Sequence, residues 1–466
     1  MFNLTDTICA ICTPVGTGSI AAIRISGPDS WKIVKKIFET AKKQPHNVRR
    51  SFASLRMTSD DVTFTHMHAL HGYIKDHEKT IDEVVLLPYK APKSYTAEDV
   101  IEIFCHGGSQ ISSMILDLCL KNGARHAKAG EFTFRAFING KIDLTEAEAI
   151  NEIIHASSEK AVFSASNILT GSLKEKINLF RDTLFDLITD IEGSIEFPLD
   201  VEEVRKNEIK LQLENINTDL KNLIGGSKEG QILREGIKVS IIGAPNVGKS
   251  SLLNCLLENE RAIVTSEAGT TRDTIEEKII IDGYPVVLVD TAGIREHSFA
   301  TEPEKLGIEK SKQSLERADI ALIMIDLTQK ENSSNEILNL VNGKPNIVVG
   351  NKVDLVERDG DYDLAISAKH GINIDKLKKL IIEKALPASS LQLPAFSFYI
   401  NQRQKELLLQ SSYHIEFAAE VCKKGDPEDL ICDELKKAIL KLDEVSGRNI
   451  SEEVIQNIFS RFCIGK

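Results

Sequence analysis

The sequence lacks several features, and each absence excludes a class of protein. Its 57 lysine and arginine residues are outnumbered by 69 aspartate and glutamate residues, which gives a formal net charge of −12. This charge excludes a protein whose whole surface is basic and binds any polyanion, but it allows a local basic groove. No segment approaches the roughly 18 apolar residues of a spanning helix, and the start, MFNLTDTICAICTPVG, has no basic stretch followed by an apolar run. We expect a cytoplasmic protein without a membrane segment.

Cysteine is also scarce. The 8 cysteines are scattered from Cys9 to Cys463, unlike the dense framework of a small secreted domain, so reduced thiols are expected. Cys9 and Cys12 have C-x-x-C spacing but no second pair, which favours strand thiols over a metal site. The histidines at 66, 68 and 71 have no accompanying ligand pattern and are interpreted as packed or solvated.

The composition is that of a folded protein with several domains. With 466 residues, 42% hydrophobic and 27% charged, the chain is long enough for two to four domains of ordinary size. Up to about residue 140, short β-like runs at 21–26, 83–88 and 100–108 surround one amphipathic helix, SQISSMILDLCLKNG. This pattern predicts an N-terminal α+β domain.

Helical periodicity follows in two separate blocks. We interpret Thr145-Glu-Ala-Glu148 as a capping box that opens a helical region broken at Gly171 and Pro198. A further helical pattern ends at Gly225, and the chain is helical again from about Asn401. Because insertion is tolerated where the ends of a domain lie close together, the two blocks predict one discontinuous all-α domain interrupted by an insertion.

The inserted segment alternates between apolar strands and helix-length stretches. The strands IKVSIIG, PVVLVD, ADIALIMID and PNIVVG lie between Ile237 and Pro387, which predicts a doubly wound α/β domain. In IEEKIIIDGYPVVLVD, Asp282 and Gly283 form a two-residue hairpin turn, so one edge of the sheet should be antiparallel.

A phosphate-binding motif opens this domain. Gly243-Ala-Pro-Asn-Val-Gly248-Lys249-Ser250 matches G-x4-G-K-[ST] and lies between an apolar strand and the helix SSLLNCLL. Its backbone amides can wrap phosphates, Lys249 can neutralise them, and Ser250 can bind Mg2+. The expected contacts of the loop are Asn246, Val247, Gly248, Lys249, Ser250 and Ser251.

Three further motifs follow strands in the order that a GTPase needs. Asp290-Thr291-Ala292-Gly293 can reach Mg2+ and the γ-phosphate, and Thr271 can act as a switch residue. In Asn351-Lys352-Val-Asp354, the carboxylate of Asp354 can accept two hydrogen bonds that guanine offers and adenine does not. Ser367-Ala368-Lys369 would contact the guanine carbonyl. Ile294 follows Gly293 where Ras-like enzymes carry glutamine, so another group must position water.

The whole chain resembles the MnmE (TrmE) family of bacterial tRNA-modification GTPases. The resemblance is carried by TICAICTPVGTGSIAAIRISGP, APKSYTAEDVIEIFCHGG, GEFTFRAFINGKIDLTEAEAI, AGTTRD and the terminal FSRFCIGK. It implies a tetrahydrofolate-binding and dimerisation domain at 1–141, a helical domain at 142–230 and 388–466, and an inserted Ras-like G domain at 231–387. It also implies a homodimer that joins an FAD-dependent MnmG-like subunit in a heterotetramer and adds an aminomethyl or carboxymethylaminomethyl group to C5 of the wobble uridine of certain tRNAs.

The same resemblance assigns roles to individual residues. Arg24, Glu102, Lys141 and Lys466 would bind 5-formyl-tetrahydrofolate or a related one-carbon folate. The switch segment Thr265-Ser266-Glu267-Ala268-Gly269-Thr270-Thr271 would contact GTP. Ser250 and Thr271 would hold Mg2+, and Asn246, Thr265, Glu267 and Thr270 would hold a K+ that activates hydrolysis as the G domains pair. The alternative for Asn246 is that its side chain only tightens the phosphate loop and binds no cation.

Some alternatives stay open at this point. Glu304 would orient the attacking water, but extra residues in HSFATEP leave Glu302 as a rival. Cys463 is either a reactive thiol of the modification chemistry or a packed inert one. At the level of the whole chain, the rival function is a GTP-dependent ribosome-assembly factor. A membrane-remodelling GTPase is disfavoured because no lipid-insertion or polybasic segment is present.

Overall fold

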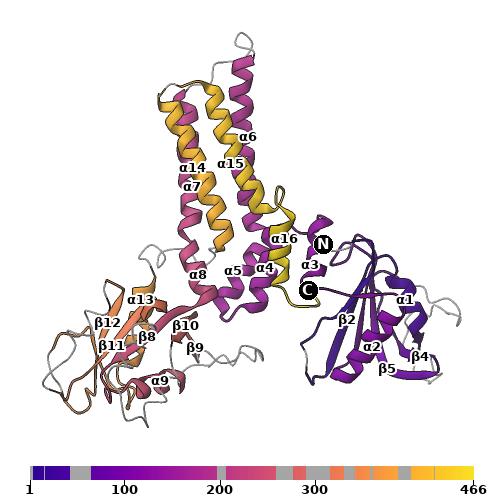
Figure 1. Ribbon diagram of the computed structural model, residues 1–466, viewed down its shortest axis with the longest axis horizontal. Helices are drawn as coiled ribbons and strands as arrows, with labels where there is room; N and C mark the ends of the chain where they lie inside the picture. The colour runs from indigo at the N-terminus through magenta and orange to yellow at the C-terminus, as the bar shows by residue number, and fades with distance from the viewer. Residues whose placement is uncertain are drawn as a thin grey trace, which may run out of the picture. The chain divides into compact units, whose positions relative to one another are not determined.

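The computed structural model describes residues 4–14, 16–41, 65–196, 206–258, 277–289, 315–329, 341, 343–356, 360–386, 400–424 and 426–466. The chain divides into two compact units, Met1–Asn151 with Ser446–Lys466, and Glu152–Val445. We describe each unit by itself, with the element labels of Figure 1. Within the described ranges, no helix has both the length and the apolar character to span a bilayer.

The first unit is built on a seven-stranded sheet in the order β3-β4-β5-β6-β2-β1-β7. Its strands are β1 (Ile8–Ile11), β2 (Ile20–Ser26), β3 (Phe38–Thr40), β4 (Leu70–Asp76), β5 (Lys79–Tyr89), β6 (Val100–His106) and β7 (Arg125–His126). Two helices, α1 (Ser30–Ile37) and α2 (Ser109–Lys121), pack on it. Alternate strand residues such as Ile23, Ile25 and Ile103 are buried in one core with the helices because successive side chains of a strand point to opposite faces. The predicted α+β domain is confirmed.

The C-terminal helix belongs to the same unit. Helix α16 (Glu452–Ser460) packs on α3 (Glu131–Ile138) beside the start of α4 (Leu144–His155). The fully buried Phe459 lies at the centre of this contact, with its ring centroid 5.5 Å from that of Phe134 and 5.3 Å from that of Phe462. Aromatic pairs at such distances add to the stabilisation from buried area.

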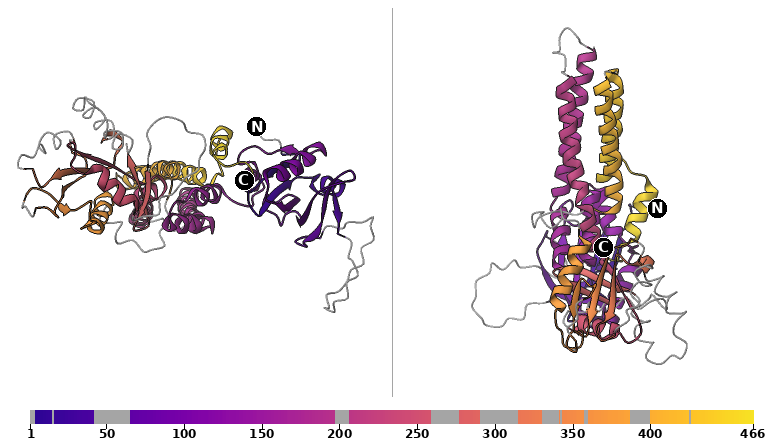
Figure 2. Two further views of the ribbon diagram at one scale, coloured as in Figure 1. Left: turned by 90° about the horizontal axis from the view of Figure 1, so that it is seen from below. Right: turned by 90° about the vertical axis from the view of Figure 1, so that its left-hand side faces the viewer.

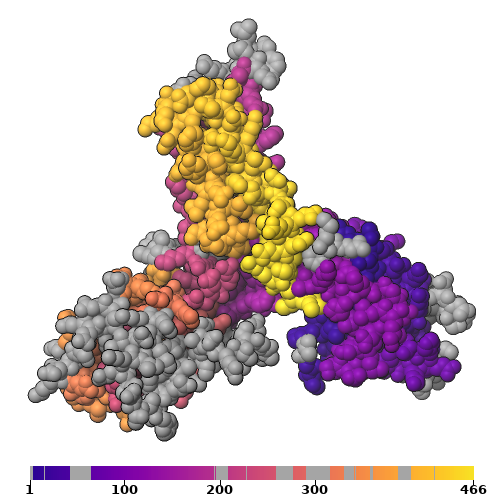
Figure 3. Space-filling view, viewed as in Figure 1, coloured from indigo at the N-terminus to yellow at the C-terminus, as the bar shows by residue number. Residues whose placement is uncertain are grey.

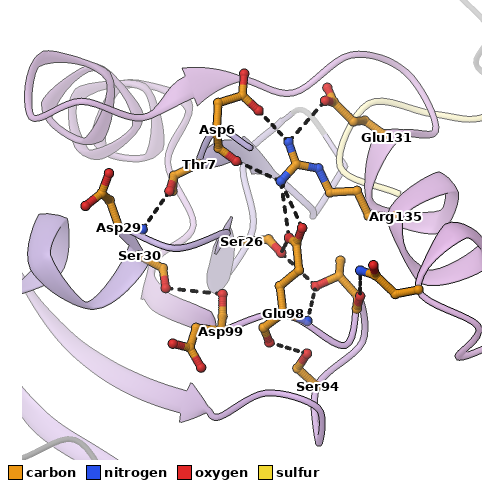
Figure 4. Close-up of polar contacts among 12 residues, drawn as sticks. Asp6, Thr7, Ser26, Asp29, Ser30, Ser94, Glu98, Asp99, Glu131 and Arg135 are labelled. Carbon is orange, nitrogen blue, oxygen red and sulfur yellow. Dashed lines mark hydrogen bonds and ion pairs between the residues drawn. The ribbon is translucent and has the colours of Figure 1, made fainter. Parts of the chain in front are cut away.

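A fully buried arginine joins several segments of this unit (Figure 4). Arg135 Nη2 donates to Asp6 Oδ1 at 2.6 Å, and Nη1 donates to both carboxylate oxygens of Glu98 at 3.2 Å. Glu131, also fully buried, lies one helical turn before Arg135 and binds Arg125 through Oε1 at 2.6 Å. Burial would raise the pKa of Asp6, but hydrogen bonds from Arg125 and Arg135 outweigh it and lower that pKa.

One local prediction was wrong by two residues. Helix α4 begins at Leu144, so Thr145 lies inside it and is not its cap. The capping box is Asp143 with Glu146: Glu146 N donates to Asp143 Oδ1 at 2.9 Å, and Asp143 N donates to Glu146 Oε2 at 2.7 Å. Both sequence windows place an acidic residue three positions after a capping residue. The hydroxyl of Thr145 donates to Asp143 Oδ1 at 2.8 Å, so Asp143 is the capping residue.

The helical part of the second unit combines segments from both sides of the insertion. Its helices are α5 (Glu159–Leu169), α6 (Ser172–Glu196), α7 (Lys206–Gly225), α8 (Ser227–Glu235), α14 (Gln402–Lys424) and α15 (Glu428–Ser446). Figures 1 and 2 show α7 beside α14 and α6 beside α15, and the residues of α14 and α15 form one continuous surface in Figure 3. Asn217 Nδ2 donates to Glu416 Oε1 at 3.1 Å, and Arg181 Nε donates to Asp443 Oδ1 at 2.9 Å. The predicted discontinuous helical domain is confirmed.

The inserted part is a six-stranded sheet in the order β13-β12-β11-β8-β10-β9. Its strands are β8 (Ile237–Gly243), β9 (Glu277–Ile281), β10 (Tyr284–Val289), β11 (Ile320–Asp326), β12 (Asn346–Asn351) and β13 (Leu364–Ile366), with helices α9 (Lys249–Glu258) and α13 (Ile374–Ala385). All neighbouring strands are parallel except β9 and β10. Asp282 and Gly283 have φ of 50° and 82°, as a tight hairpin turn requires. The predicted doubly wound domain and its antiparallel edge are confirmed.

The buried arginine predicts a large effect on stability. Replacing Arg135 by methionine keeps a long side chain but leaves Asp6, Glu98 and Glu131 without its charge. We expect a loss of about 3–5 kcal/mol in the free energy of unfolding of the first unit. The single tryptophan, Trp31, lies in α1 of that unit, so its fluorescence during urea unfolding measures the loss. The control, Lys75→Met, removes a partly exposed ion pair with Glu39 and should cost at most about 1 kcal/mol. Equal shifts for the two variants would contradict the prediction.

Candidate functional site

The phosphate-loop motif lies at the carboxyl end of β8. That strand ends at Gly243, and α9 begins at Lys249, so the loop passes directly into a helix N-terminus, where backbone amides favour anions. Lys249 Nζ donates to the carbonyl oxygens of Gly243 and Ala244, both at 2.8 Å. The ammonium group of Lys249 therefore lies over the phosphate loop, against two of its backbone carbonyls. Burial lowers the pKa of this amine, because a poorly solvated cation is less stable than the neutral form.

Asn351 fixes the phosphate loop against two other segments of the site. Its Nδ2 donates to the Val247 carbonyl at 2.8 Å, and its Oδ1 accepts from the Ala368 amide at 3.0 Å. Gly248, with φ of +104°, lies so close that a Cβ would be 2.2 Å from Asn351 Nδ2. The phosphate loop therefore meets two motifs that follow it by more than a hundred residues, through one buried amide side chain.

Asp354 is arranged to accept hydrogen bonds. A hydrogen bond from Ser367 is the main cause that lowers the pKa of this carboxyl group, and His370 contributes. His370 Nε2 lies 3.5 Å from Asp354 Oδ2. An ionised carboxylate offers only acceptors, which suits the paired donors of guanine. The structure thus brings together the predicted residues 246–251, 351–354 and 367–369.

The other predicted GTPase residues lie outside the described residues. These are Thr265, Ser266, Glu267, Ala268, Gly269, Thr270, Thr271, Asp290, Thr291, Ala292, Gly293, Glu302 and Glu304. One described residue that the sequence reasoning missed is Asp326, whose carboxylate binds Lys352. The sequence shows that Asp326 is the acidic end of the apolar strand ADIALIMID, but its contact with Lys352 depends on β11 and β12 being neighbours.

A second candidate site is a cavity of about 480 Å³ in the first unit. Arg24, Glu102 and Lys141, all predicted site residues, line it together with the unpredicted Tyr89 and Tyr95. Arg24 and Glu102 are register partners on β2 and β6, and Nε and Nη2 of Arg24 both lie 2.9 Å from Glu102 Oε1.

The guanidinium of Arg24 lies close to two aromatic rings. It lies 4.8 Å from the ring centroid of Tyr95 and 5.6 Å from that of Phe132. Its Nη1 is buried and has no hydrogen-bond partner among the described residues. A buried donor without a partner is costly, so the cavity presents a position where an acceptor from a ligand would be favourable.

The C-terminal tail lies beside this part of the sheet. Gly130 N donates to the Cys463 carbonyl at 3.4 Å, and Phe132 N donates to the Lys466 carbonyl at 3.2 Å, so the tail caps the start of α3. Cys12 Sγ lies 3.3 Å from the Gly465 carbonyl oxygen. Burial raises the pKa of Cys12, while the nearby Arg24 and Lys466 oppose that rise. Lys466 therefore lies near Cys12, and it does not line the cavity.

The thiols of this region differ in exposure. Cys9 is fully buried in β1, and burial raises its pKa to about 12, so it is an unreactive packed thiol. Cys463 is exposed and has a free thiol. Its carbonyl is used to cap α3, whereas its side chain faces solvent.

Comparison with known proteins extends over the whole chain. Residues 7–141 match the family model described as the GTP-binding protein TrmE N-terminus, and residues 144–463 match the MnmE helical domain. The chain is 40% identical over 473 residues to the tRNA modification GTPase MnmE of Thermotoga petrophila, with 99% of this chain and 100% of that protein covered. It is 40% identical over 480 residues to the protein of the same name from Moorella thermoacetica, again with 99% and 100% covered. The matched models and these full-length relatives establish that the chain belongs to the MnmE (TrmE) family.

Proposed function

We propose that this chain is a GTPase that takes part in adding an aminomethyl or carboxymethylaminomethyl group to C5 of the wobble uridine of certain tRNAs. The observation that carries the proposal is the buried Asn351, which joins the phosphate loop to the base-recognition motif in a chain whose full-length relatives are named tRNA modification GTPases. An FAD-dependent MnmG-like subunit is the proposed partner, in the cytoplasm. With a net charge of −12, tRNA contact must be confined to one face or shared with that partner.

We assign the domains as 1–141 for folate binding and dimerisation, 142–230 with 388–466 for the helical domain, and 231–387 for GTP binding. The limits of the two family-model matches support the first boundary. This division places residues 446–466 in the helical domain, although in the structure they cluster with the first unit.

In the proposed GTP site, oxygen ligands would hold two cations beside the phosphates. Ser250 and Thr271 would hold Mg2+, whose preference for oxygen ligands they fit. Asn246, Thr265, Glu267 and Thr270 would hold K+, and Asn246 has the left-handed φ of 61° that a tight loop around phosphates needs. Lys249 neutralises phosphate charge, and Glu304, with Glu302 as the alternative, would orient water. The bound cation supplies positive charge where the transition state gains negative charge.

In the proposed folate site, charge and shape fit a one-carbon folate. Glu102 can accept hydrogen bonds from a polar pterin ring, and Arg24, Lys141 and Lys466 can bind the anionic glutamate tail. The aromatic lining by Tyr89 and Tyr95 suits a planar ring. The folate supplies the one-carbon unit when bound. Cys463, exposed at the tail, is the proposed thiol for the modification step.

The exposed face of the first sheet supports homodimerisation. Ile20 is 64% exposed and Val85 is 40% exposed, and they alternate along β2 and β5 with residues of the core. Arg24 and Glu102 lie on the same face, since strand residues two apart share a face, but their side chains are covered and only 14% and 17% exposed. Covering apolar side chains such as these would be favourable, which supports the first unit as the dimer interface.

The overall proposal predicts a chemical change in tRNA. In cells that lack this protein, mass spectrometry of tRNA nucleosides should show wobble uridines without the C5 substituent. The wild-type gene should restore it. A Lys249→Ala gene, which removes the ammonium over the phosphate loop, should not. Fully modified wobble uridine in the deleted cells would contradict the proposal and favour the ribosome-assembly alternative.

The cation proposal predicts a difference between potassium and sodium. At equal ionic strength, GTP hydrolysis should be faster in K+ than in Na+ by about 10²-fold, the size of a single well-placed electrostatic contribution to a transition state. Asn246→Ala should bring the rate in K+ down to that in Na+. Equal wild-type rates in the two salts would rule out the cation site.

The folate proposal predicts a loss of affinity on removing one guanidinium. Arg24→Ala should weaken binding of 5-formyl-tetrahydrofolate by about 10–100-fold, because a charge-assisted hydrogen bond is lost. Isothermal titration of the full chain measures this loss. Lys32→Ala, at an exposed position of α1, is the matched control and should bind as the wild type does. Unchanged binding by Arg24→Ala would contradict the assignment of the cavity.

A further inference from the structure

The cavity of the first unit carries more positive than negative charge. Of the described residues that line it, Arg24, Lys93 and Lys141 are cations, and Glu102 is a carboxylate. Arg24 and Glu102 neutralise each other at 2.9 Å, and their side chains are only 14% and 17% exposed. Lys93 and Lys141 are exposed and form no ion pair with another described residue. The cavity therefore has a neutral, covered interior and a positively charged mouth.

Lys93 projects from a backbone that is held in place. Its amide donates to the Lys90 carbonyl at 2.9 Å. The next residue, Ser94, is only 6% exposed, and its hydroxyl donates to the Glu98 carbonyl at 2.5 Å, as Figure 4 shows. The exposed ammonium group of Lys93 is thus carried by a fixed turn, so little backbone freedom is lost when a ligand binds to it.

Lys141 reaches the same cavity from a different segment. It follows α3, where Gly140 has the left-handed φ of 69°. The Gly140 amide donates to the Phe137 carbonyl at 3.0 Å, and the Lys141 amide donates to the Ala136 carbonyl at 2.9 Å. This pair of bonds is a Schellman motif, which fixes the end of the helix. Lysines from two fixed segments therefore meet at one cavity.

A folate would divide between the two parts of this cavity. The volume of about 480 Å³ is that of a site for one small molecule. A pterin ring at Glu102 would fill the covered interior, so the far end of the glutamate tail would leave through the mouth. Each further γ-linked glutamate adds one carboxylate to that tail. Ammonium groups at the mouth are suitable partners for these carboxylates.

We propose that Lys93 is a specificity-determining residue for the length of the folate tail. It binds carboxylates of the γ-linked glutamates beyond the first, so the site prefers polyglutamylated one-carbon folates to the monoglutamate. This role rests on the proposed folate binding and goes beyond it. Because Lys93 and its ligand carboxylates are exposed, the preference depends on salt, which screens such charges.

The test is the affinity of the full-length chain for 5-formyl-tetrahydrofolate that carries one or three glutamates. In isothermal titration at low salt, the wild-type chain should bind the triglutamate about fivefold more tightly, the size of one exposed ion pair. Lys93→Met keeps the apolar stem and removes the charge. It should bind the monoglutamate as the wild type does and lose the preference for the triglutamate.

A lysine of the same segment provides the matched control. Lys90 is exposed, lies three residues before Lys93 and does not line the cavity, so Lys90→Met should keep the fivefold preference. Lys93→Glu should reverse the preference, because the introduced carboxylate repels the longer tail. Raising the salt from about 0.1 M to about 1 M should bring the wild-type preference close to one.

Each result decides the question. Equal wild-type affinities for the two folates overturn the proposal, and so does a preference that Lys93→Met keeps or that Lys90→Met loses to the same extent. If Lys93→Met weakens tRNA binding and keeps the glutamate preference, the lysine serves the nucleic acid and the proposal is overturned. A wild-type chain that binds neither folate contradicts the proposed folate site itself, and the role of Lys93 with it.

Discussion

The site in the inserted domain depends on one constraint, the meeting of parallel strand ends at one edge of a sheet. Every residue of β11 is buried, because helices and loops cover both faces of a parallel sheet. Most side chains within β8, β11 and β12 are therefore apolar, and the polar residues of the site lie where these strands end. Gly243, Asp326 and Asn351 are the last residues of β8, β11 and β12.

In the first unit, the comparable constraint is a buried charge. Arg135 is fully buried, and its partners come from the start of the chain, the segment after β5 and its own helix. A desolvated guanidinium is tolerable only when acceptors surround it, so these segments are fixed relative to one another. Helix α3 is fixed with them, and its first turn receives the C-terminal tail. Phe132 of α3 lies next to Arg24 at the cavity. The cavity around Arg24 and Glu102 thus depends on the hydrogen-bond network of Arg135, although neither residue belongs to that network.

The sequence predicted the fold well where the signal was local. Alternation of strands and helices gave the doubly wound domain, and Asp282-Gly283 gave the antiparallel edge, because turn chemistry and periodicity depend on neighbouring residues. The capping box was placed two residues late, since Asp143 and Thr145 are both good capping residues and only the hydrogen bonds of the folded chain distinguish them. In the candidate site, motif spacing found Asn351 and Asp354 but not Asp326, whose contact across the sheet depends on which strands are neighbours.

The sequence by itself determined the kinds of chemistry available to this protein. A glycine-rich loop before a helix, an acidic residue after an asparagine-lysine pair, and a chain that resembles one family from end to end are all properties of residue order. Only the tertiary structure decided which side chains meet. Arg24 faces Glu102 across two strands, the tail from Cys463 to Lys466 caps α3, and Asn351 holds Val247 and Ala368 together. These contacts join residues far apart in the chain, and their geometry follows from strand order and packing, which no local pattern encodes.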